Sequence, residues 1–393
     1  MDDQPATEMT DMDPRQREKE FLATCHQEYP IPMNNIFQEI KDIAKIGEGI
    51  FGEVYQGNVP LLGEGGHGDT CNVASVVFKI VPIEGEEFVN GERQKKFEEV
   101  APEVVITEKL GKLGENMSEP NVTGGYAKMY YSYLACGEYP ANLVTAWNKW
   151  HEVNDSDNDA PMFSVDQKFV VFLFEHGGED AGCYQFKDAK QTFFMIMQII
   201  HMLAVAEIAL EFEHRDLHGN NILIKKTHQD FSTFKVNGKV MNVPTCGIIP
   251  TIIDFTFSRI KDPGTNAEIF LDMADDEEMF MSTGNYQFDI YRMMRDANRN
   301  RWGPFNPKSN IMWLHYLVDK LLSKKHWTET ATFDHRVFLG QMHHLKSRLL
   351  SFTSCHDFVC SPLLGKYLTM PDPKEYEAAS RGRRISVKRD VKK

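Results

Sequence analysis

The sequence predicts an α+β protein of two lobes, in which a small, mainly β lobe with one main helix precedes a larger, mainly helical lobe. Three observations favour this class. Strand-like apolar segments recur from residue 40 to residue 174, and a single helical pattern at 94–112 interrupts them. Two glycines, Gly177 and Gly178, follow the last of these strands. Beyond them, residues 189–213 carry nearly continuous Phe, Met, Ile and Leu, which predicts a long buried helix.

Length and composition exclude several classes of protein. A chain of 393 residues can bury at least one large core. The most apolar stretch, 193–210, is interrupted by Gln198, His201 and Glu207, so we expect no membrane span, and the Met-Asp-Asp start shows no secretory signal. Seven cysteines without close pairs predict reduced thiols, as in the nucleus or cytosol. The net charge of -14 argues against a general nucleic-acid binder and favours a basic partner.

The first lobe is predicted at 36–173, after a leader at 1–35 that we expect to be flexible or to lie as a strap across the surface. At its start, residues 40–55 read as two strands joined by glycines at 47, 49 and 52. This Gly-x-Gly-x-x-Gly-x-Val pattern is typical of the loop that covers the phosphates in protein kinases. A dinucleotide-binding site would need a helix after the glycines, whereas Val54 continues a strand.

One lysine interrupts the next apolar strand, at 76–81. Lys79 would be costly to bury without a partner, so we expect it to pair with an acid and with ligand phosphate. The helix at 94–112 supplies the acid, because Glu103 falls between apolar positions of the same face. Pro102 is expected in the first turn of this helix, where its missing N–H is tolerated.

The remaining strands of this lobe are predicted at 127–135 and 168–174, and residues 174–178 are predicted to form a hinge whose backbone at Glu175 and His176 reads an adenine edge. The second lobe is predicted at 179–370. A simple exit from the strand into a turn would produce the same local pattern as a hinge.

The helix at 189–213 leads into a polar segment, residues 214–224. Asp216 is followed five residues later by Asn221, which is the spacing of the protein-kinase catalytic loop. There the acid accepts the proton of an attacking hydroxyl, and the amide holds a metal ion near the phosphates. His-Arg-Asp also occurs as an ordinary structural pair, so the other motifs must support the assignment.

A second metal ligand is predicted directly after the strand at 248–253. Asp254 occupies this position and Phe255 packs behind it. Thr256 replaces the usual glycine, and no Ala-Pro-Glu follows, so an activation segment controlled by phosphorylation is not expected. Before this strand, the Asn-Gly pair at 237–238 predicts the turn of a hairpin whose first strand is at 222–224.

Three charged features follow. Residues 272–278 hold five acids and no base, which suits either a solvated turn or a docking surface for a basic peptide. Asp289, bracketed by apolar residues, is predicted to be a buried acid that anchors the catalytic loop. The segment 371–393 is predicted to be a disordered basic tail, because residues 381–393 carry seven Lys or Arg against one Asp. This tail is the part of the chain suited to nuclear import or nucleic-acid contact.

The motifs occur in the order found in protein kinases, and their details resemble haspin, an atypical kinase family. The resemblance rests on the glycine loop 47–54, the run from Ala204 to His218, the Asp-Phe-Thr variant at 254–256, and Tyr286–Arg292 followed by 300–303. It covers roughly residues 36–360. His218 stands where most kinases have lysine, as it does in haspins.

The resemblance implies a nuclear, chromosome-associated serine/threonine kinase of mitosis or meiosis that uses ATP and magnesium and phosphorylates a threonine near the N-terminus of histone three. Haspins are active without phosphorylation of the activation segment. Carried over by position, the implied catalytic residues are Lys79, Glu103, Asp216, Asn221 and Asp254, the metal ligands are Asn221 and Asp254, and the peptide-binding residues are Asp180, Asp275, Asp276, Glu277 and Glu278. The implied nucleotide site comprises Ile46, Gly47, Glu48, Gly49, Ile50, Phe51, Gly52, Glu53, Val54, Lys79, Glu175, His176, Gly177, Gly178, Glu179, Asp180, Asp216, Leu217, His218, Gly219, Asn220, Asn221, Asp254, Phe255 and Thr256.

Other functions stay open at this level. A divergent kinase fold acting as a scaffold is disfavoured by the intact catalytic set. A small-molecule kinase shares the acid-plus-five-amide loop but usually lacks the full glycine loop and the Asp-Phe pair. A third alternative is a protein kinase whose substrate is a basic protein other than histone three.

Overall fold

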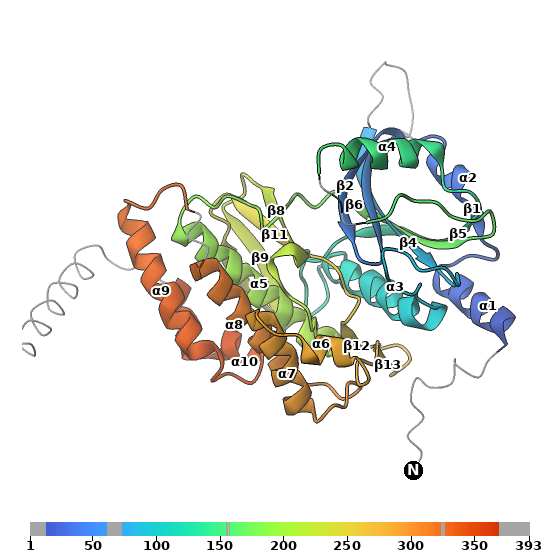
Figure 1. The fold of residues 1–393 in the computed structure, drawn as a ribbon. Coiled ribbons are helices and arrows are strands. Elements are labelled where there is room, and N and C mark those ends of the chain that lie inside the picture. The colour runs from blue at the N-terminus through green and yellow to red at the C-terminus, as the bar shows by residue number, and fades with distance from the viewer. Residues whose placement is uncertain (1–12, 61–72, 155, 157, 324–326, 369–393) are drawn as a thin grey trace, which may run out of the picture. The chain divides into compact units, whose positions relative to one another are not determined.

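The computed structural model describes residues 13–60, 73–154, 156, 158–323 and 327–368, and these have the predicted α+β character (Figure 1). The chain separates into two compact units. Along the chain the main division falls between Gly177 and Gly178. The first unit contains the described residues of Met1–Lys112, Ala127–Gly177 and Asp254–Thr256, and the second contains those of Leu113–Tyr126, Gly178–Ile253 and Phe257–Lys393. The predicted basic tail at 371–393 lies outside the described residues.

A six-stranded sheet forms the first unit, in the order β1-β5-β6-β4-β3-β2. Alternate side chains of each strand enter opposite cores: in β4, Phe78 and Ile80 face one cluster and Val81 and Ile83 the other. Helices α1 and α3 cover one face, and α2 and α4 cover the other (Figure 1). The elements are α1 (Pro14–Thr24), β1 (Ile31–Pro32), α2 (Met33–Phe37), β2 (Lys41–Gly49), β3 (Gly52–Pro60), β4 (Val73–Ile83), α3 (Phe97–Gly111), β5 (Met129–Cys136), α4 (Ala141–His151) and β6 (Lys168–Glu175).

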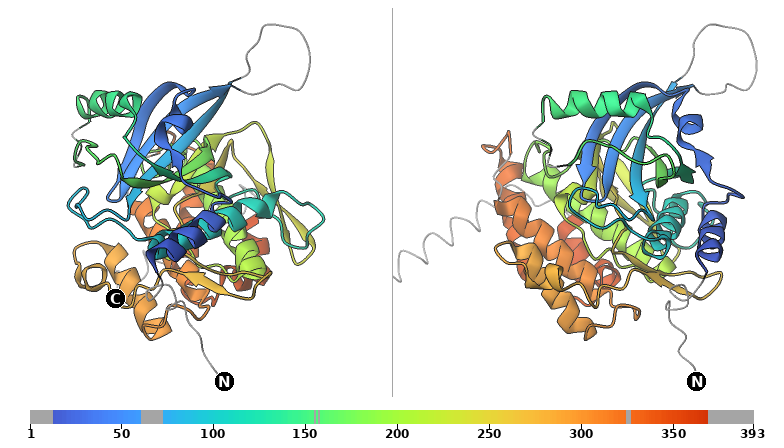
Figure 2. Two further views of the ribbon diagram at one scale, coloured as in Figure 1. Left: turned by 90° about the vertical axis from the view of Figure 1, so that its right-hand side faces the viewer. Right: turned by 45° about the vertical axis from the view of Figure 1, so that its right-hand side comes forward.

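The prediction of a flexible leader is wrong for the described part of residues 1–35. Asp13 caps helix α1 by accepting a hydrogen bond from the N–H of Arg15. Phe21 of α1 packs on Phe97 of α3 with ring centroids 5.0 Å apart, so that the two helices lie side by side (Figure 2). The charged, proline-containing composition concealed one short apolar stripe, and that stripe is enough to attach the segment to the core.

Helix α3 begins three residues later than predicted, at Phe97. Two carboxylates fix this start, because Glu99 accepts from the N–H of Lys96 at 2.7 Å and Glu84 accepts from the N–H of Phe97 at 2.6 Å. Pro102 is therefore the sixth helical residue and not part of the first turn, which corrects the prediction.

The second unit is built around helix α5 (Ala189–Leu210), whose side chains are almost all buried. By length and composition α5 would suit a membrane span, but 89% of its most apolar window is buried inside the unit, as in the core helix of a globular domain. It ends at Leu210, before the predicted 213, because Glu211 adopts the left-handed conformation. The helices around it are α6 (Glu277–Met281), α7 (Tyr286–Asn298), α8 (Lys308–Ser323), α9 (Phe333–Leu349), α10 (Cys355–Cys360) and α11 (Pro362–Leu368).

Small sheets complete this unit. The Asn237-Gly238 turn joins β9 to β10 with positive φ at both residues, as a two-residue hairpin requires. The predicted partner strand at 222–224 is wrong, since it belongs to β8, which pairs with β11 and β7. The strands are β7 (Glu179–Asp180), β8 (Ile222–Lys226), β9 (Phe231–Val236), β10 (Lys239–Pro244), β11 (Ile248–Ile252), β12 (Arg259–Lys261) and β13 (Glu268–Phe270).

Candidate active site

In the first unit, Lys79 lies in the middle of β4 and projects toward two acids. Its Nζ is 2.6 Å from Oε1 of Glu103 on α3 and 3.7 Å from Oδ2 of Asp254. Glu103 is buried, whereas the side chains of Lys79 and Asp254 are 24% and 39% exposed. The structure thus brings together the predicted lysine, helix glutamate and metal-binding aspartate, and leaves part of the lysine and aspartate open to a ligand.

Thr256 gives this cluster a further connection. Its hydroxyl lies 3.0 Å from Oε2 of Glu103 and 2.8 Å from Oδ1 of Asp254, and its N–H donates to the same Asp254 oxygen at 3.2 Å. A glycine, the residue usual at this position, has no hydroxyl to join the two carboxylates. Phe255 is buried behind them, as predicted.

Lys79 and Asp254 hold each other ionised. Burial lowers the pKa of Lys79, but the carboxylates of Asp254 and Glu103 outweigh burial and raise it above its usual value. Burial likewise raises the pKa of Asp254, but Lys79 and the hydrogen bonds from Thr256 outweigh that effect and hold it below its usual value. An ionised carboxylate is the form that binds a hard cation such as Mg²⁺.

The predicted phosphate-covering loop is the hairpin between β2 and β3. Gly49 pairs with Gly52, and Ile50 and Phe51 form the turn. At Gly52 a Cβ atom would come within 2.3 Å of the carbonyl oxygen of Ile80, so a side chain at this position would force the hairpin away from β4. The hairpin is thus held close to the strand that carries Lys79.

Two acids predicted for the nucleotide site have a structural role. Glu48 and Glu53 lie 2.5 and 2.6 Å from the buried ammonium of Lys45, which links the two strands of the hairpin. Glu53 also accepts a hydrogen bond from Asn158 at 2.8 Å. Their carboxylates therefore stabilise the hairpin itself.

Sequence reasoning missed Lys95, a second buried lysine near the cluster. Its Nζ lies 4.2 Å from the centroid of the Phe51 ring at the hairpin tip. Burial lowers the pKa of Lys95, and the carboxylate of Glu103 partly opposes this. The flanking pattern Gln-Lys-Lys-Phe resembles an exposed charged turn, so nothing in the sequence indicated its burial.

The predicted hinge residues lie at the end of β6 and the start of the second unit. Glu175 is the last residue of β6, and His176 and Gly177 follow it. Gly178 has a φ of +109°, and a Cβ there would come within 2.2 Å of the carbonyl oxygen of Ile224. Glu179 and Asp180 then pair with β8.

In the second unit, buried side chains hold the backbone of the catalytic loop. Arg215 is fully buried and contacts Glu213 at 3.2 Å, and it donates to the carbonyl oxygen of Trp302 at 2.6 Å. Glu213 also accepts from Ser309 of α8 and from the N–H of Asn306. Nε and Nη2 of Arg215 are hydrogen-bonded in this way, and the residue adopts a φ of +67°.

The side chain of Asp216 is 16% exposed, and its Oδ2 is 3.5 Å from Nε2 of His218. Asn221 donates from Nδ2 to the Asp216 carbonyl oxygen at 2.9 Å, which directs its Oδ1 away as a ligand atom. Leu217 is buried core, whereas Gly219–Asn221 form a short 3-10 helix. A Cβ atom added at Gly182 would lie 2.3 Å from Oδ1 of Asn220, so the loop is close to the segment after β7.

The residues present fit magnesium. Among the described residues no group of three or more His, Cys, Asp or Glu is arranged to hold a metal by itself. Asp254 in the first unit offers a carboxylate oxygen, and Asn221 in the second unit offers an amide oxygen; each is a hard ligand of the type that Mg²⁺ prefers.

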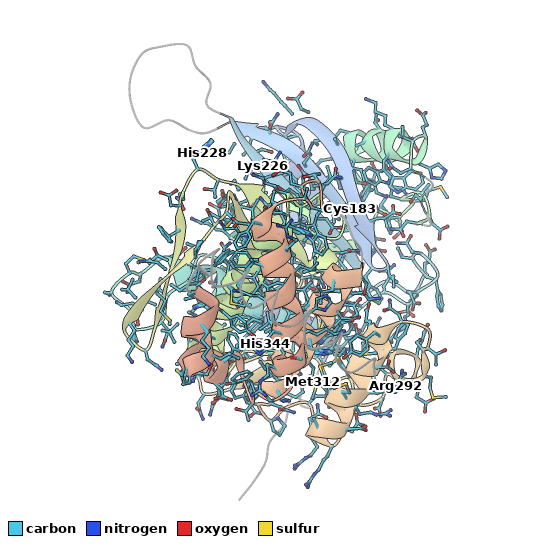
Figure 3. All side chains as sticks on the ribbon, turned by 90° about the vertical axis from the view of Figure 1, so that its left-hand side faces the viewer. Cys183, Lys226, His228, Arg292, Met312 and His344 are labelled. Carbon is cyan, nitrogen blue, oxygen red and sulfur yellow. The ribbon has the colours of Figure 1, made fainter. Side chains whose placement is uncertain are left out.

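The prediction that Asp289 is a buried anchor is wrong. Asp289 is exposed and pairs with Arg292, one turn along α7, at 2.6 Å. Arg292 is labelled in Figure 3. The residue of α7 that reaches the catalytic loop is Tyr291, whose hydroxyl donates to Oδ1 of Asp216 at 2.5 Å. Positions two residues apart on a helix point about 200° away from each other around its axis, so Asp289 and Tyr291 face opposite sides of α7. The buried residues Ile290 and Met294 mark the inner face.

The acidic segment is a turn followed by α6. Asp275, Glu277 and Glu278 are exposed. Asp276 is half-buried and caps α6 by accepting from the N–H of Met279 at 2.9 Å. Asp180, the other residue predicted to contact a peptide, accepts from the N–H of Gly182 at 2.5 Å beside the catalytic loop.

The described residues therefore carry a glycine hairpin, a lysine–glutamate ion pair and an Asp-Phe-Thr segment in one unit, and an Asp216–Asn221 loop in the other. This set, on an α+β fold, defines a protein-kinase-like domain. A family model described as the haspin-like kinase domain matches residues 5–353. The chain belongs to the haspin family of serine/threonine protein kinases.

Individual relatives agree with the family model. The chain is 38% identical over 360 residues to serine/threonine-protein kinase haspin of Bos taurus, covering 88% of this chain and 43% of the relative. It is 35% identical over 342 residues to the haspin homolog of Drosophila melanogaster, covering 86% and 58%, and 34% identical over 355 residues to that of Arabidopsis thaliana, covering 89% and 55%. The chain spans about half the length of the curated relatives it matches.

Proposed function

We propose that this chain is an ATP-dependent serine/threonine protein kinase. The observation that carries the proposal is the cluster in which Lys79 pairs with Glu103 while Asp254 stays ionised. Phosphoryl transfer depends mainly on positioning and neutralising charge, and a lysine, a carboxylate and an amide supply the groups for both. The cluster has no evident use in a pure scaffold.

In this proposal Lys79 would contact the nucleotide phosphates, Asp254 and Asn221 would offer oxygen ligands to magnesium, and the bound ion would supply neutralisation of the phosphate charge. Asp216 accepts the proton of the substrate hydroxyl as that oxygen bonds to the γ-phosphorus, and ADP leaves. The glycine hairpin and the backbone at 175–178 bind the rest of the nucleotide.

The substrate that we propose is a threonine near the N-terminus of histone three, phosphorylated in the nucleus on chromosomes of dividing cells. Family membership supports this, and so do the net charge of -14 and the exposed carboxylates of Asp275, Glu277 and Glu278, which suit a basic peptide. Activity without phosphorylation of the chain is also proposed. Its support is Arg215, which is already paired with Glu213 and so needs no phosphate to order it.

The test is transfer of phosphate from ATP to a histone three N-terminal peptide by the purified chain with magnesium. A threonine-to-alanine peptide and the Asp216→Asn variant are the controls, and Asp216→Asn is expected to lower kcat by about a hundredfold or more. Peptide binding without transfer would favour the scaffold. Equal transfer to unrelated basic peptides would support the protein-kinase activity but contradict the proposed histone substrate.

A further inference from the structure

The carboxylate of Asp216 uses its two oxygens differently. Oδ1 accepts the hydrogen bond from the Tyr291 hydroxyl at 2.5 Å. Oδ2 has the more distant contacts, with Nδ2 of Asn221 at 3.5 Å and Nε2 of His218 at 3.5 Å. Oδ2 is therefore the oxygen with capacity to accept a short hydrogen bond from another group.

The tyrosine is itself held in place from two sides. It is 4% exposed, and its ring lies edge-on to Trp313 of α8 with the centroids 5.3 Å apart. Gln287, one turn earlier on α7, donates from Nε2 to the phenolic oxygen at 3.1 Å. Because that oxygen already accepts a hydrogen bond, its own proton is directed to Asp216.

The hydroxyl stays a donor in this environment. Burial, followed by the negative charge of Asp216, raises the pKa of Tyr291 well above its usual value. A side chain whose ring and oxygen are both fixed can hold a partner in one rotamer, and groups that transfer protons depend on such positioning.

We propose that Tyr291 is a positioning residue for phosphoryl transfer: it binds Oδ1 of Asp216 and fixes the carboxylate so that Oδ2 is presented to the substrate hydroxyl. The inference rests on the proposed role of Asp216 as proton acceptor. It places on α7 a function that sequence reasoning had assigned to Asp289.

Tyr291→Phe is the direct test, because it keeps the ring against Trp313 and removes the hydroxyl alone. We expect kcat with the histone three peptide to fall about tenfold or more, while KM for ATP and for peptide change less than about twofold. The matched control is Tyr286→Phe, which removes a hydroxyl of the same helix that bonds His315 at 2.8 Å, and we expect it to keep wild-type kinetics. An unchanged kcat in Tyr291→Phe would overturn the inference.

A double-mutant cycle separates positioning from a structural role. If Tyr291 acts through Asp216, adding Tyr291→Phe to Asp216→Asn should lower the residual kcat by less than about twofold. The same loss in both backgrounds would overturn the inference, because packing alone would then explain it. Wild-type turnover in Asp216→Asn alone would reject the proposed role of Asp216, and the inference with it.

A second variant covers the case in which Tyr291→Phe fails to fold. Gln287→Leu removes the donor that orients the phenolic oxygen and leaves Tyr291 in place. We expect a smaller loss of kcat, about threefold, again without a change in KM and again absent from the Asp216→Asn background. Unchanged kcat in this variant, with a wild-type melting temperature, would count against the arrangement.

Discussion

At the scale of single residues, Thr256 shows how a departure from a familiar motif acquires a role. The threonine replaces a glycine that many kinases have before their activation segment. In this fold its hydroxyl joins the carboxylates of Glu103 and Asp254. The substitution therefore stabilises the arrangement in which Glu103 stays paired with Lys79.

Replacing Thr256 tests this role directly. Thr256→Gly should lower kcat/KM for ATP about fivefold to tenfold, because one hydrogen-bonded hydroxyl is lost from partly buried carboxylates and the backbone gains freedom. Thr256→Ser keeps the hydroxyl and should stay within about twofold of the wild type. Steady-state kinetics with varied ATP measures both, and equal activity in the glycine and serine variants would show that the hydroxyl is not needed.

The ion pair of Lys79 also predicts a pH dependence of stability. The pKa of Asp254 is below its ordinary 3.8, so its pairing stabilises the fold above that pH and the stabilisation is lost as pH falls through the lower, folded-state value. The pKa of Lys79 is above its ordinary 10.5, so its contribution is complete below that pH and is lost only at higher pH.

Urea unfolding of the wild type and of Lys79→Met measures this effect. The difference in unfolding free energy between them should be steady near neutral pH and should shrink as pH falls below about 4, because Asp254 is then protonated in the unfolded state and, at lower pH still, in the folded state. A difference that grows on acidification would have the wrong sign. Lys109→Met, on the same unit but outside the cluster, is the matched control.

At the scale of secondary-structure elements, the pairing of β7 with β8 depends on Gly178. Both a positive φ and a close approach to the Ile224 carbonyl oxygen exclude a side chain there. Gly238, in the β9–β10 turn, has a φ of +78° but open space around its Cβ position. A side chain at Gly238 would therefore meet backbone strain alone, whereas a side chain at Gly178 would meet both strain and a steric collision.

Gly238→Ala should cost about 1 kcal/mol of unfolding free energy, from strain alone. Gly178→Ala should cost at least about 2 kcal/mol more, since the collision with backbone adds to the strain and must displace β7. Urea unfolding at neutral pH compares the two. Equal costs would mean that the β7–β8 contact adjusts freely.

Other elements show which features are visible in a sequence. Helix α5 was evident from its continuous apolar residues, and the Asn237-Gly238 turn from its residue types. Helix α1 was not evident, because its only buried side chains are Phe21 and Leu22 in a strongly charged segment. The pairing of β8 was predicted wrongly because strand partners are chosen by contacts distant in sequence, not by the nearest turn.

At the scale of the whole molecule, the net charge of -14 predicts how substrate binding responds to salt. Long-range attraction to a basic peptide is screened as ionic strength rises. KM for the histone three peptide should increase severalfold between about 50 and 300 mM NaCl, with a smaller change in kcat. A peptide with acetylated lysines is the control, and the same salt response from it would show that charge attraction is not the cause.

The sequence by itself determined the motifs and the candidate catalytic residues, because each motif is a short run whose proposed chemistry depends on covalent spacing: Asp216 and Asn221 in one loop, Asp254 after a strand, Lys79 within another. Tertiary structure alone decided which neighbours support them. Tyr291, Thr256 and Lys95 matter through contacts with residues distant in sequence, which depend on the direction that each side chain faces after folding. The choice between Asp289 and Tyr291 shows the reason most directly, since two positions on one helix differ only in the face that packing buries.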